Sequence, residues 1–568
     1  MSVWRRLLIG GLLVVGCGST PPVTSNPVAD EAGPDGHRRL DHAVVPLRYD
    51  LDLTVDPAEA AYAGQAQIAV RLEAARAVVE LHGRDLDVDS VTAAVGAAER
   101  KGRAVQGPNG GLALVFAEPL PAGEVTLKLS FRARLPEVPN GLYRVKEGGL
   151  WYAFTQFEPM YARQAFPCFD QPEFKTPYRV TLRVPQGQLA LANSPEQSRR
   201  DELGLTVFEF AETKPLPTYL VAFAVGEFDV VEAPADAIPN LPLRLVATKG
   251  KGRLAKYALE RAPVIHKALS DYFGTPHPFA KLDLVAVPNF AAGAMENVGL
   301  ITFRETLLLL DEASAPANHK MWSQSVIAHE MAHMWFGNEV TLAWWDDLWL
   351  NEAFATWTAA WVVASVDPEL EMDLERVAGT AWVMDLDAQA HTRSIRQPIA
   401  HGGDVHNAFD GITYGKGAAV LRMLESWIGR ETFRDGVRAY LAAHAYGTAT
   451  TSDLLEALAR QSGKPVAETA KWFLDQPGTP LVQIDVLCTE GGPATLGLSQ
   501  RRALPAGSTA PQGEPWHVPM CVRYGIGEEV HRECFLLEGK QQTVALHAPG
   551  CPAWLSGNDD QRGYYQWR

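Results

Sequence analysis

The sequence predicts a multidomain α+β protein with an N-terminal antiparallel β domain, a mostly α-helical domain and a small C-terminal β-sandwich. Residues 38–229 alternate apolar and polar positions with a period of two, as half-buried strands do. Residues 230–477 contain long stretches with helical periodicity, and strand-like patterns return over 478–568. A chain of 568 residues is long enough to bury a core in each of these three domains.

The first element is a leader predicted over residues 1–17. Arg5 and Arg6 precede an apolar run over 7–15, which is too short to span a bilayer. The run leads into Val-Val-Gly-Cys, which resembles a bacterial lipobox in which Cys17 is lipidated. The alternative is cleavage by another signal peptidase and plain secretion.

The second element, residues 18–37, is rich in Ser, Thr, Pro, Asp and Gly and is predicted to be a flexible tether. Together with a lipidated Cys17 it predicts an extracytoplasmic bacterial lipoprotein. The membrane is then a partner through the lipidated Cys17, and the protein is expected on the outer membrane, on its periplasmic side or at the cell surface.

Within the three domains, particular segments carry the prediction. Residues 47–55 show the strand alternation clearly, and a turn at 107–111 combines Gly, Pro and Asn. Helical periodicity is found over 254–273, 321–336, 353–365, 418–428 and 452–461. The strand pattern of the last domain begins near 482–486 and is interrupted by a loop over 505–515.

Four cysteines, Cys488, Cys521, Cys534 and Cys551, lie in the last domain. In an oxidising compartment they predict two disulfides, and three pairings are open. A second zinc site is the alternative, although no C-x-x-C spacing supports it. Cys168 stands alone in an apolar segment and is predicted to be buried.

Composition excludes one class of partner. The net charge is −16, and no stripe of basic residues interrupts the acidic background. A nucleic-acid partner is therefore not expected.

The most informative motif is His-Glu-Met-Ala-His at positions 329–333, followed nineteen residues after His333 by Glu352. Two histidines four apart on a helix lie within about 40° of each other on one face. With Glu352 they make three ligands for one Zn²⁺ per chain and leave a fourth position open, as catalytic zinc sites do. Glu330 points off that axis, where it can take a proton from a zinc-activated water.

On further motifs the chain resembles the M1 family of zinc aminopeptidases, in the gluzincin group and similar to aminopeptidase N. The specific match beyond the zinc motif is Gly293, Ala294, Met295, Glu296 and Asn297, which fit the family's G-x-M-E-N sequence. Other matching runs lie at 155–159, 166–170, 344–352 and 414–417. The resemblance covers nearly everything from residue 40 onward and implies a thermolysin-like catalytic domain.

The resemblance also implies how a peptide with a free N-terminus is bound and cleaved. Glu296 and Glu158, with Gln156 beside it, are expected to hold the α-ammonium group, and the 293–297 segment to bind substrate. A cation is held well by carboxylates in a poorly hydrated pocket. Tyr414 matches the tyrosine that stabilises the oxyanion, beside Glu330 as general base.

Two further residues, Asp347 and Asn351, are expected to support the metal ligands from behind. Val298 and Phe303 stand where related proteins often carry Trp and Tyr, which alters the substrate pocket. We also expect a short form without the family's helical C-terminal domain, with a more open cleft, and oligomerisation is compatible with that form.

Three alternatives remain at this point. An epoxide hydrolase of the leukotriene branch is disfavoured by the β character of 478–568. A thermolysin-like endopeptidase has no need of Glu296 as an ammonium ligand. A peptide-binding lipoprotein with an unused site has no need of the intact set of metal and catalytic residues.

Overall fold

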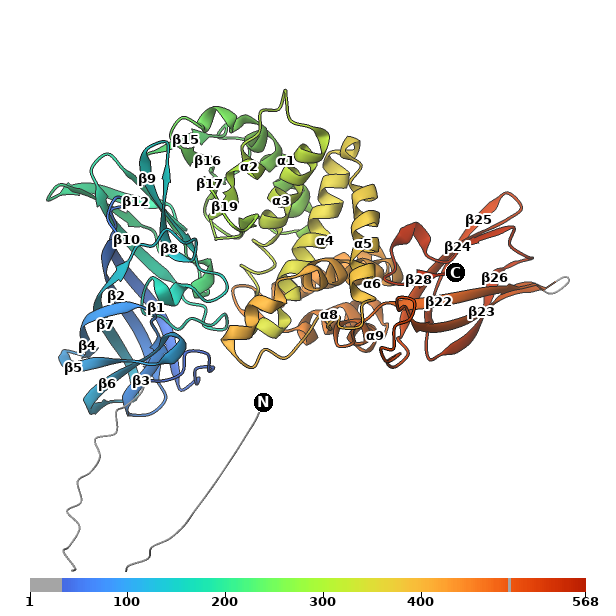
Figure 1. The fold of residues 1–568 in the computed structure, drawn as a ribbon, viewed down its shortest axis with the longest axis horizontal. Helices are drawn as coiled ribbons and strands as arrows, with labels where there is room; N and C mark the ends of the chain where they lie inside the picture. The colour runs from blue at the N-terminus through green and yellow to red at the C-terminus, as the bar shows by residue number, and fades with distance from the viewer. Residues whose placement is uncertain (1–32, 489–491) are drawn as a thin grey trace, which may run out of the picture. The chain divides into compact units, whose positions relative to one another are not determined.

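The protein is described here by a computed structural model that covers residues 33–488 and 492–568 (Figure 1). The leader predicted over 1–17, with its lipidated Cys17, lies outside the described residues, as do residues 18–32 of the predicted tether. Within the described part, Gly36 already contacts the folded body, because its N–H donates to Pro108 O at 3.0 Å.

A ten-stranded sheet dominates the N-terminal region, in the order β12-β13-β10-β1-β2-β7-β4-β5-β6-β3. Its strands are β1 (Val44–Thr54), β2 (Ala61–Leu72), β3 (Arg76–His82), β4 (Leu86–Val95), β5 (Ala98–Gln106), β6 (Gly111–Leu120), β7 (Gly123–Arg134), β10 (Tyr178–Pro185), β12 (Glu196–Glu202) and β13 (Leu205–Phe210). Burial alternates residue by residue along β2, as its sequence period predicts. The β1–β10 pair is parallel, so the sheet is mixed and not purely antiparallel as expected.

A second N-terminal sheet leads toward the functional site. It has the order β11-β14-β9-β8. The strands are β8 (Gly141–Glu147), β9 (Leu150–Gln156), β11 (Leu189–Ala192) and β14 (Phe223–Gly226). Because β9 ends at Gln156, it presents Gln156 and the following Glu158 at its end.

The middle region begins with a five-stranded sheet of order β15-β16-β17-β19-β18. Its strands are β15 (Phe228–Glu232), β16 (Leu243–Thr248), β17 (Leu282–Val287), β18 (Ala294–Met295) and β19 (Leu300–Arg304). The strand β15 crosses the domain boundary predicted at residue 229 and pairs with β16. Every residue of β17 is buried, as expected of a strand covered on both faces.

The rest of the middle region is helical. The helices are α1 (Lys256–Phe273), α2 (Glu305–Leu308), α3 (Ala317–Ala332), α4 (Trp349–Val366), α5 (Met372–Asp387), α6 (Gly417–Ile428), α7 (Arg430–His444), α8 (Thr451–Ser462) and α9 (Val466–Leu474). Two short parallel strands, β20 (Thr341–Leu342) and β21 (Thr448–Ala449), pair with each other and join loops that are distant in sequence. Among the described residues, no helix is both long and apolar enough to cross a membrane.

The last region contains two sheets, as a β-sandwich requires. One has the order β26-β23-β22-β28 and the other β25-β24-β27. The strands are β22 (Pro480–Leu487), β23 (Pro493–Arg502), β24 (Val518–Ile526), β25 (Glu529–Leu537), β26 (Gln541–Pro549), β27 (Trp554–Ser556) and β28 (Gln566–Trp567). The mixed α+β architecture with a β-rich start and a helical middle is therefore confirmed.

The cysteines of the last region form two disulfides. Cys488 is bonded to Cys551, and Cys521 to Cys534 across the β24–β25 pair. These bonds choose one of the three open pairings and leave no thiolate there for the alternative zinc site. Cys168 is a buried free thiol, as predicted.

Lys175 joins the N-terminal region to the loops behind the functional site. Its Nζ donates to the carbonyl oxygens of Asn338 and Glu339, both at 2.9 Å, and of Gly447 at 3.1 Å. The three acceptors match the three donors of one ammonium group. Burial lowers the pKa of Lys175 to about 7, so these carbonyls stabilise a charge that has lost most of its water.

We predict that Lys175→Met lowers the free energy of unfolding by about 2–3 kcal/mol. It leaves the carbonyl oxygens of Asn338 and Glu339 without the Lys175 donor, while that of Gly447 still accepts from Thr341 N–H. Chemical denaturation monitored by fluorescence measures the change. Lys267→Met is the matched control, since Lys267 is exposed and its ion-pair partner among the described residues is Asp271, one helical turn away. Equal stability of the two variants would contradict the prediction.

Candidate functional site

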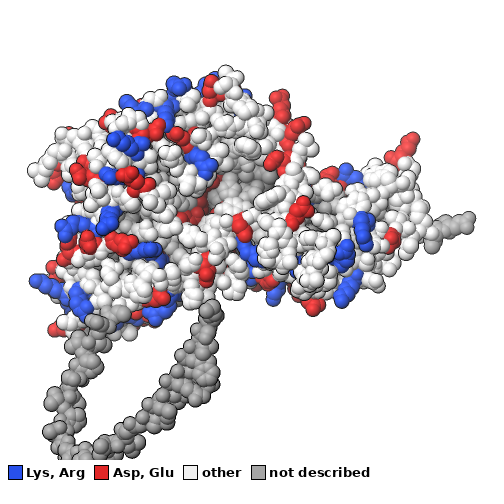
Figure 2. Space-filling model, viewed as in Figure 1, with Lys and Arg blue, Asp and Glu red and all other residues white. Residues whose placement is uncertain are grey.

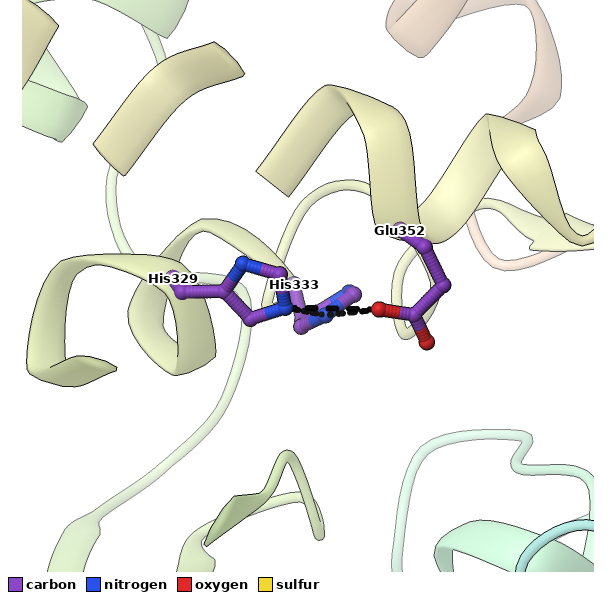
Figure 3. A group of neighbouring side chains, drawn as sticks. All are labelled: His329, His333 and Glu352. Carbon is purple, nitrogen blue, oxygen red and sulfur yellow. Dashed lines mark hydrogen bonds and ion pairs between the residues drawn. The ribbon is translucent and has the colours of Figure 1, made fainter. Parts of the chain in front are cut away.

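The end of α3 brings the two predicted histidines to one point. His329 lies in the last turn of α3, and His333 follows as its C-cap with helical backbone angles of −58° and −23°. Glu352 comes from the first turn of α4. Figure 3 shows the two imidazole rings and the carboxylate pointing toward one another.

The separations of the three ligand atoms fit a tetrahedral Zn²⁺. His329 Nε2 and His333 Nε2 are 3.0 Å apart, and they lie 3.3 Å and 3.6 Å from Glu352 Oε2. Tetrahedral bonds of about 2.0 Å place neighbouring ligand atoms about 3.3 Å apart. Two imidazoles and one carboxylate are also the donor set that zinc favours.

The far side of each ring is held so that Nε2 faces the metal position. His333 Nδ1 donates to the carbonyl oxygen of Phe336 at 2.9 Å, which leaves the lone pair on Nε2. His329 Nδ1 lies 3.4 Å from Thr356 Oγ1. Burial lowers the pKa of His329, which favours the neutral imidazole that binds metal.

Gly337 is a supporting residue that the sequence analysis missed. Its φ is +122°, and a Cβ there would lie 3.2 Å from both His333 Nδ1 and Asn351 Nδ2. Its carbonyl oxygen accepts from Thr341 Oγ1 at 2.6 Å. Glycine is therefore required where the chain turns back under His333. In the sequence, the position of this Gly four residues after the last histidine of the motif could have indicated its role.

Acidic side chains surround the ligand set. Burial is the main cause that raises the pKa of Glu158, Glu296 and Glu330, and the negative charge of neighbouring carboxylates raises the pKa of Glu158 and Glu330 further. Burial opposes ionisation of Glu352 too, but hydrogen bonds from His329 and His333 lower its pKa to about 2. The site thus gathers ionisable carboxyl groups away from water, where nearby positive charge stabilises their charged forms.

Two of these carboxylates have an oxygen without a hydrogen-bond partner in the described part of the chain, although Glu296 Oε1 lies 3.9 Å from His333 Nδ1. Among the described residues, Oε1 of Glu158 and Oε1 of Glu296 are inaccessible and have no hydrogen-bond partner. Glu296 lies directly after β18 and Glu158 just after β9, so two sheets deliver them to the same cavity. They are placed to receive a cationic group beside the metal position.

The remaining residues of the predicted substrate segment divide into two groups. Gly293, Ala294 and Met295 line the cavity, and Gln156 Nε2 contacts Met295 Sδ at 3.6 Å. Asn297 is buried behind them, and its Nδ2 donates to Thr302 Oγ1 at 3.1 Å. Asn338, which the sequence analysis did not identify, holds the backbone of Glu296 by donating to its carbonyl oxygen at 2.7 Å.

Tyr414 lies in a π-helical turn, Ile412–Lys416, that leads into α6. Its ring is nearly parallel to that of His329, with centroids 6.1 Å apart. Burial and then the charge of Glu352 raise the pKa of Tyr414 well above its usual value, so the phenol keeps its proton. Widened turns of this kind are frequent at functional sites because they redirect one side chain.

The two expected supporting residues differ in position. Asn351 packs against Gly337 and donates to Tyr219 Oη at 3.3 Å, close behind His333. Asp347 instead accepts from Arg396 Nε at 2.7 Å and from the N–H and hydroxyl of Thr451. Asp347 therefore anchors the start of α8 and does not hold a metal ligand.

These groups open into a cavity of about 920 Å³. It is lined by residues of the N-terminal β region, of the 290–296 segment and of α3 to α6. Figure 2 shows a hollow near the centre of this face with acidic side chains gathered in it. A volume of this size accommodates a short peptide.

We predict one zinc ion per chain, measured by inductively coupled plasma mass spectrometry after dialysis. His333→Ala is expected to lose the metal and its stabilising effect on thermal unfolding, because two remaining ligands bind zinc far more weakly. The exposed His391→Ala is the control and should retain the metal. Equal zinc content in both variants would refute the assignment of the ligands.

We also predict that Gly337→Ala weakens zinc binding by about tenfold or more, because the added methyl group would lie too close to the His333 ring. It should also lower the free energy of unfolding by about 2 kcal/mol, because alanine is strained at a positive φ. Competition with a fluorescent chelator measures the affinity. Gly379→Ala, inside α5 with open space around it, should leave zinc affinity unchanged.

Comparison with known proteins agrees with this geometry. The Peptidase M1 N-terminal domain matches residues 45–220, and the Peptidase family M1 domain matches residues 257–473. The chain is 36% identical to aminopeptidase M1-B of Oryza sativa subsp. japonica over 550 residues, which cover 94% of this chain and 61% of the relative. It is 36% identical to aminopeptidase M1 of Arabidopsis thaliana, with 94% and 62% covered.

Endoplasmic reticulum aminopeptidase 1 of Homo sapiens is 31% identical over 604 residues, with 98% of this chain and 63% of the relative covered. The chain thus spans about three-fifths of the length of these relatives. Since the two family models together account for most of the sequence and include the His329, His333 and Glu352 cluster, the chain belongs to peptidase family M1.

Proposed function

We propose that this protein is a zinc-dependent aminopeptidase that hydrolyses the first peptide bond of peptides with a free N-terminus. The observation that carries the proposal is a pair of buried carboxylate oxygens, on Glu158 and Glu296, beside the three proposed metal ligands. Among the described residues neither oxygen has a hydrogen-bond partner. An enzyme that cleaves within a chain has no use for two buried carboxylates next to its metal. The α-ammonium group of a substrate supplies the charge that they lack.

His329, His333 and Glu352 would hold the metal in a thermolysin-like catalytic region. When bound there, zinc supplies Lewis-acid chemistry that activates water and polarises the carbonyl to be cleaved. Glu330 accepts the proton of the attacking water and delivers it to the leaving amine. Burial raises the pKa of Glu330 well above its usual value, which suits a group that must both take and return a proton.

Tyr414 stabilises the oxyanion that forms on the scissile carbonyl. Its high pKa keeps the phenol a hydrogen-bond donor at neutral pH, and its stacking on His329 places it at the edge of the metal position. One such donor typically contributes about 10²–10³ in rate.

The cellular setting that we propose follows from the leader. Lipidation of Cys17 after removal of residues 1–16 would anchor the enzyme outside the cytoplasm, where its two disulfides are stable. Its substrates would be peptides present in that compartment.

We predict that the purified protein releases p-nitroaniline from leucine p-nitroanilide and leaves the N-acetylated compound intact, because acetylation removes the cation that Glu158 and Glu296 bind. Glu330→Gln should lower kcat by about 10³-fold or more with zinc still bound. Absorbance at the nitroaniline band measures the rate, and metal analysis verifies the occupancy of the variant.

Glu296→Gln separates recognition from chemistry. It should raise KM for the free-amine substrate and reduce discrimination against the acetylated one. Equal cleavage of the two compounds by the unaltered protein would indicate an endopeptidase. Absence of cleavage across several first residues, with zinc bound, would indicate a peptide-binding role.

A further inference from the structure

A buried arginine lines the proposed substrate cavity, and no acidic side chain in the described part of the chain pairs with it. Arg422, on α6, is 7% exposed and forms part of the cavity wall. Its NH1 donates to Thr380 Oγ1 at 3.2 Å. Within residues 33–488 and 492–568, no carboxylate lies within ion-pair distance of its guanidinium.

The nearest acidic residues are already engaged by other arginines. Glu425 lies 3.4 Å from Arg562 and 3.6 Å from Arg430. Asp373 lies 3.1 Å from Arg376. Burial, followed by repulsion from Arg376 and Arg562, lowers the pKa of Arg422 to about 9. A buried guanidinium without an acidic partner destabilises the fold unless an anion enters the cavity and pairs with it.

We propose that Arg422 binds a carboxylate of the substrate on the leaving-group side of the scissile bond. This inference rests on the proposed aminopeptidase function and names its substrate class, which is short peptides that carry such a carboxylate. The carboxylate is either the C-terminus of the peptide or the side chain of an acidic residue. Planar guanidinium groups bind carboxylates through two parallel hydrogen bonds, which gives both strength and orientation.

The position of Arg422 along the chain suits this role. Arg422 follows Tyr414 by eight residues in a nearly continuous helical segment, a rise of about 12 Å. Three residues of extended peptide span about 10 Å. If the first carbonyl of a tri- or tetrapeptide lies near Tyr414, the distance from that carbonyl to the C-terminal carboxylate is therefore similar to the distance from Tyr414 to Arg422.

Thr380 holds the guanidinium in place for this contact. Its hydroxyl donates to the carbonyl oxygen of Arg376 at 2.8 Å, so the oxygen presents a lone pair to Arg422 NH1. The Thr380 contact uses one of the five N–H donors of Arg422.

The experiment compares substrates that differ only in the carboxylate. Leucyl-glycyl-glycine and leucyl-triglycine are compared with their C-terminal amides, and leucyl-glutamyl-glycinamide with leucyl-glutaminyl-glycinamide. If Arg422 binds the C-terminus, kcat/KM should be about 10–100-fold higher for the peptide acids than for their amides. If it binds an acidic side chain, the glutamyl peptide should exceed the glutaminyl peptide by the same factor, which is the range expected of a charged hydrogen bond. The other pair should differ little, which identifies the source.

Arg422→Met should reduce that preference to about onefold, and Arg422→Lys should retain part of it. Both should cleave leucine p-nitroanilide, which has no carboxylate, within about twofold of the unaltered protein. Arg562→Gln is the matched control, because it removes a neighbouring positive charge outside the cavity lining and should keep the preference.

Thermal unfolding distinguishes a binding role from a structural one. Arg422→Met should unfold at the same temperature as the unaltered protein or higher, since it removes a buried charge without a partner. A lower unfolding temperature together with an unchanged substrate preference would overturn the proposal. So would the absence of any carboxylate preference in the unaltered protein.

Failure of the proposed function is recognised separately, as absence of cleavage of leucine p-nitroanilide. Calorimetry on Glu330→Gln then tests the carboxylate site without turnover. The peptide acid that is preferred should bind about 10–100-fold more tightly than its amide, and the added Arg422→Met change should abolish the difference. Equal affinity for acid and amide would overturn the inference in that case too.

Discussion

The constraint that organises the centre of this molecule is the burial of four carboxylates around two imidazoles. Glu158, Glu296, Glu330 and Glu352 meet in one cavity, and burial alone disfavours their charged forms. Such a cluster is stabilised by nearby positive charge. In the function that we propose, a divalent metal on three ligands and a substrate ammonium group beside Glu158 and Glu296 would both supply such charge, so metal binding and substrate recognition would share one electrostatic origin.

The surrounding structure serves to hold that cluster rigid. The turn after α3 is fixed by Gly337, by the carbonyl of Phe336 that orients His333, and by Asn338, which fastens the backbone of Glu296. Lys175 fastens the same turn from the N-terminal region through the carbonyls of Asn338 and Glu339. The N-terminal region therefore does more than supply Gln156 and Glu158, because the loop before β10 also supports the turn that follows the predicted metal ligand His333.

Several predictions from the sequence agree with the described structure because they rest on local rules. The spacing of His329 and His333 is a property of any helix, and Glu352 falls on the next long helix, where one carboxylate reaches both rings. The expectation that Asp347 supports the metal ligands was wrong, because its contacts are not local. Its neighbours in sequence are site residues, but its side chain turns toward Arg396 and Thr451, which lie far along the chain. The pairing of Cys488 with Cys551 likewise depended on which strands become neighbours.

The sequence by itself determined which side chains could ligate a metal at the centre, because their spacing on a helix and their residue types are both local. It also determined the alternation that makes the N-terminal strands and the periodicity that makes the central helices. Only the tertiary structure decided which oxygens of the described residues lack hydrogen-bond partners and which glycine must lie beneath His333. It also decided that Arg422 lines the cavity with no described carboxylate at ion-pair distance. These are properties of contacts between segments distant in sequence, and no local pattern encodes whether a buried charge meets a partner.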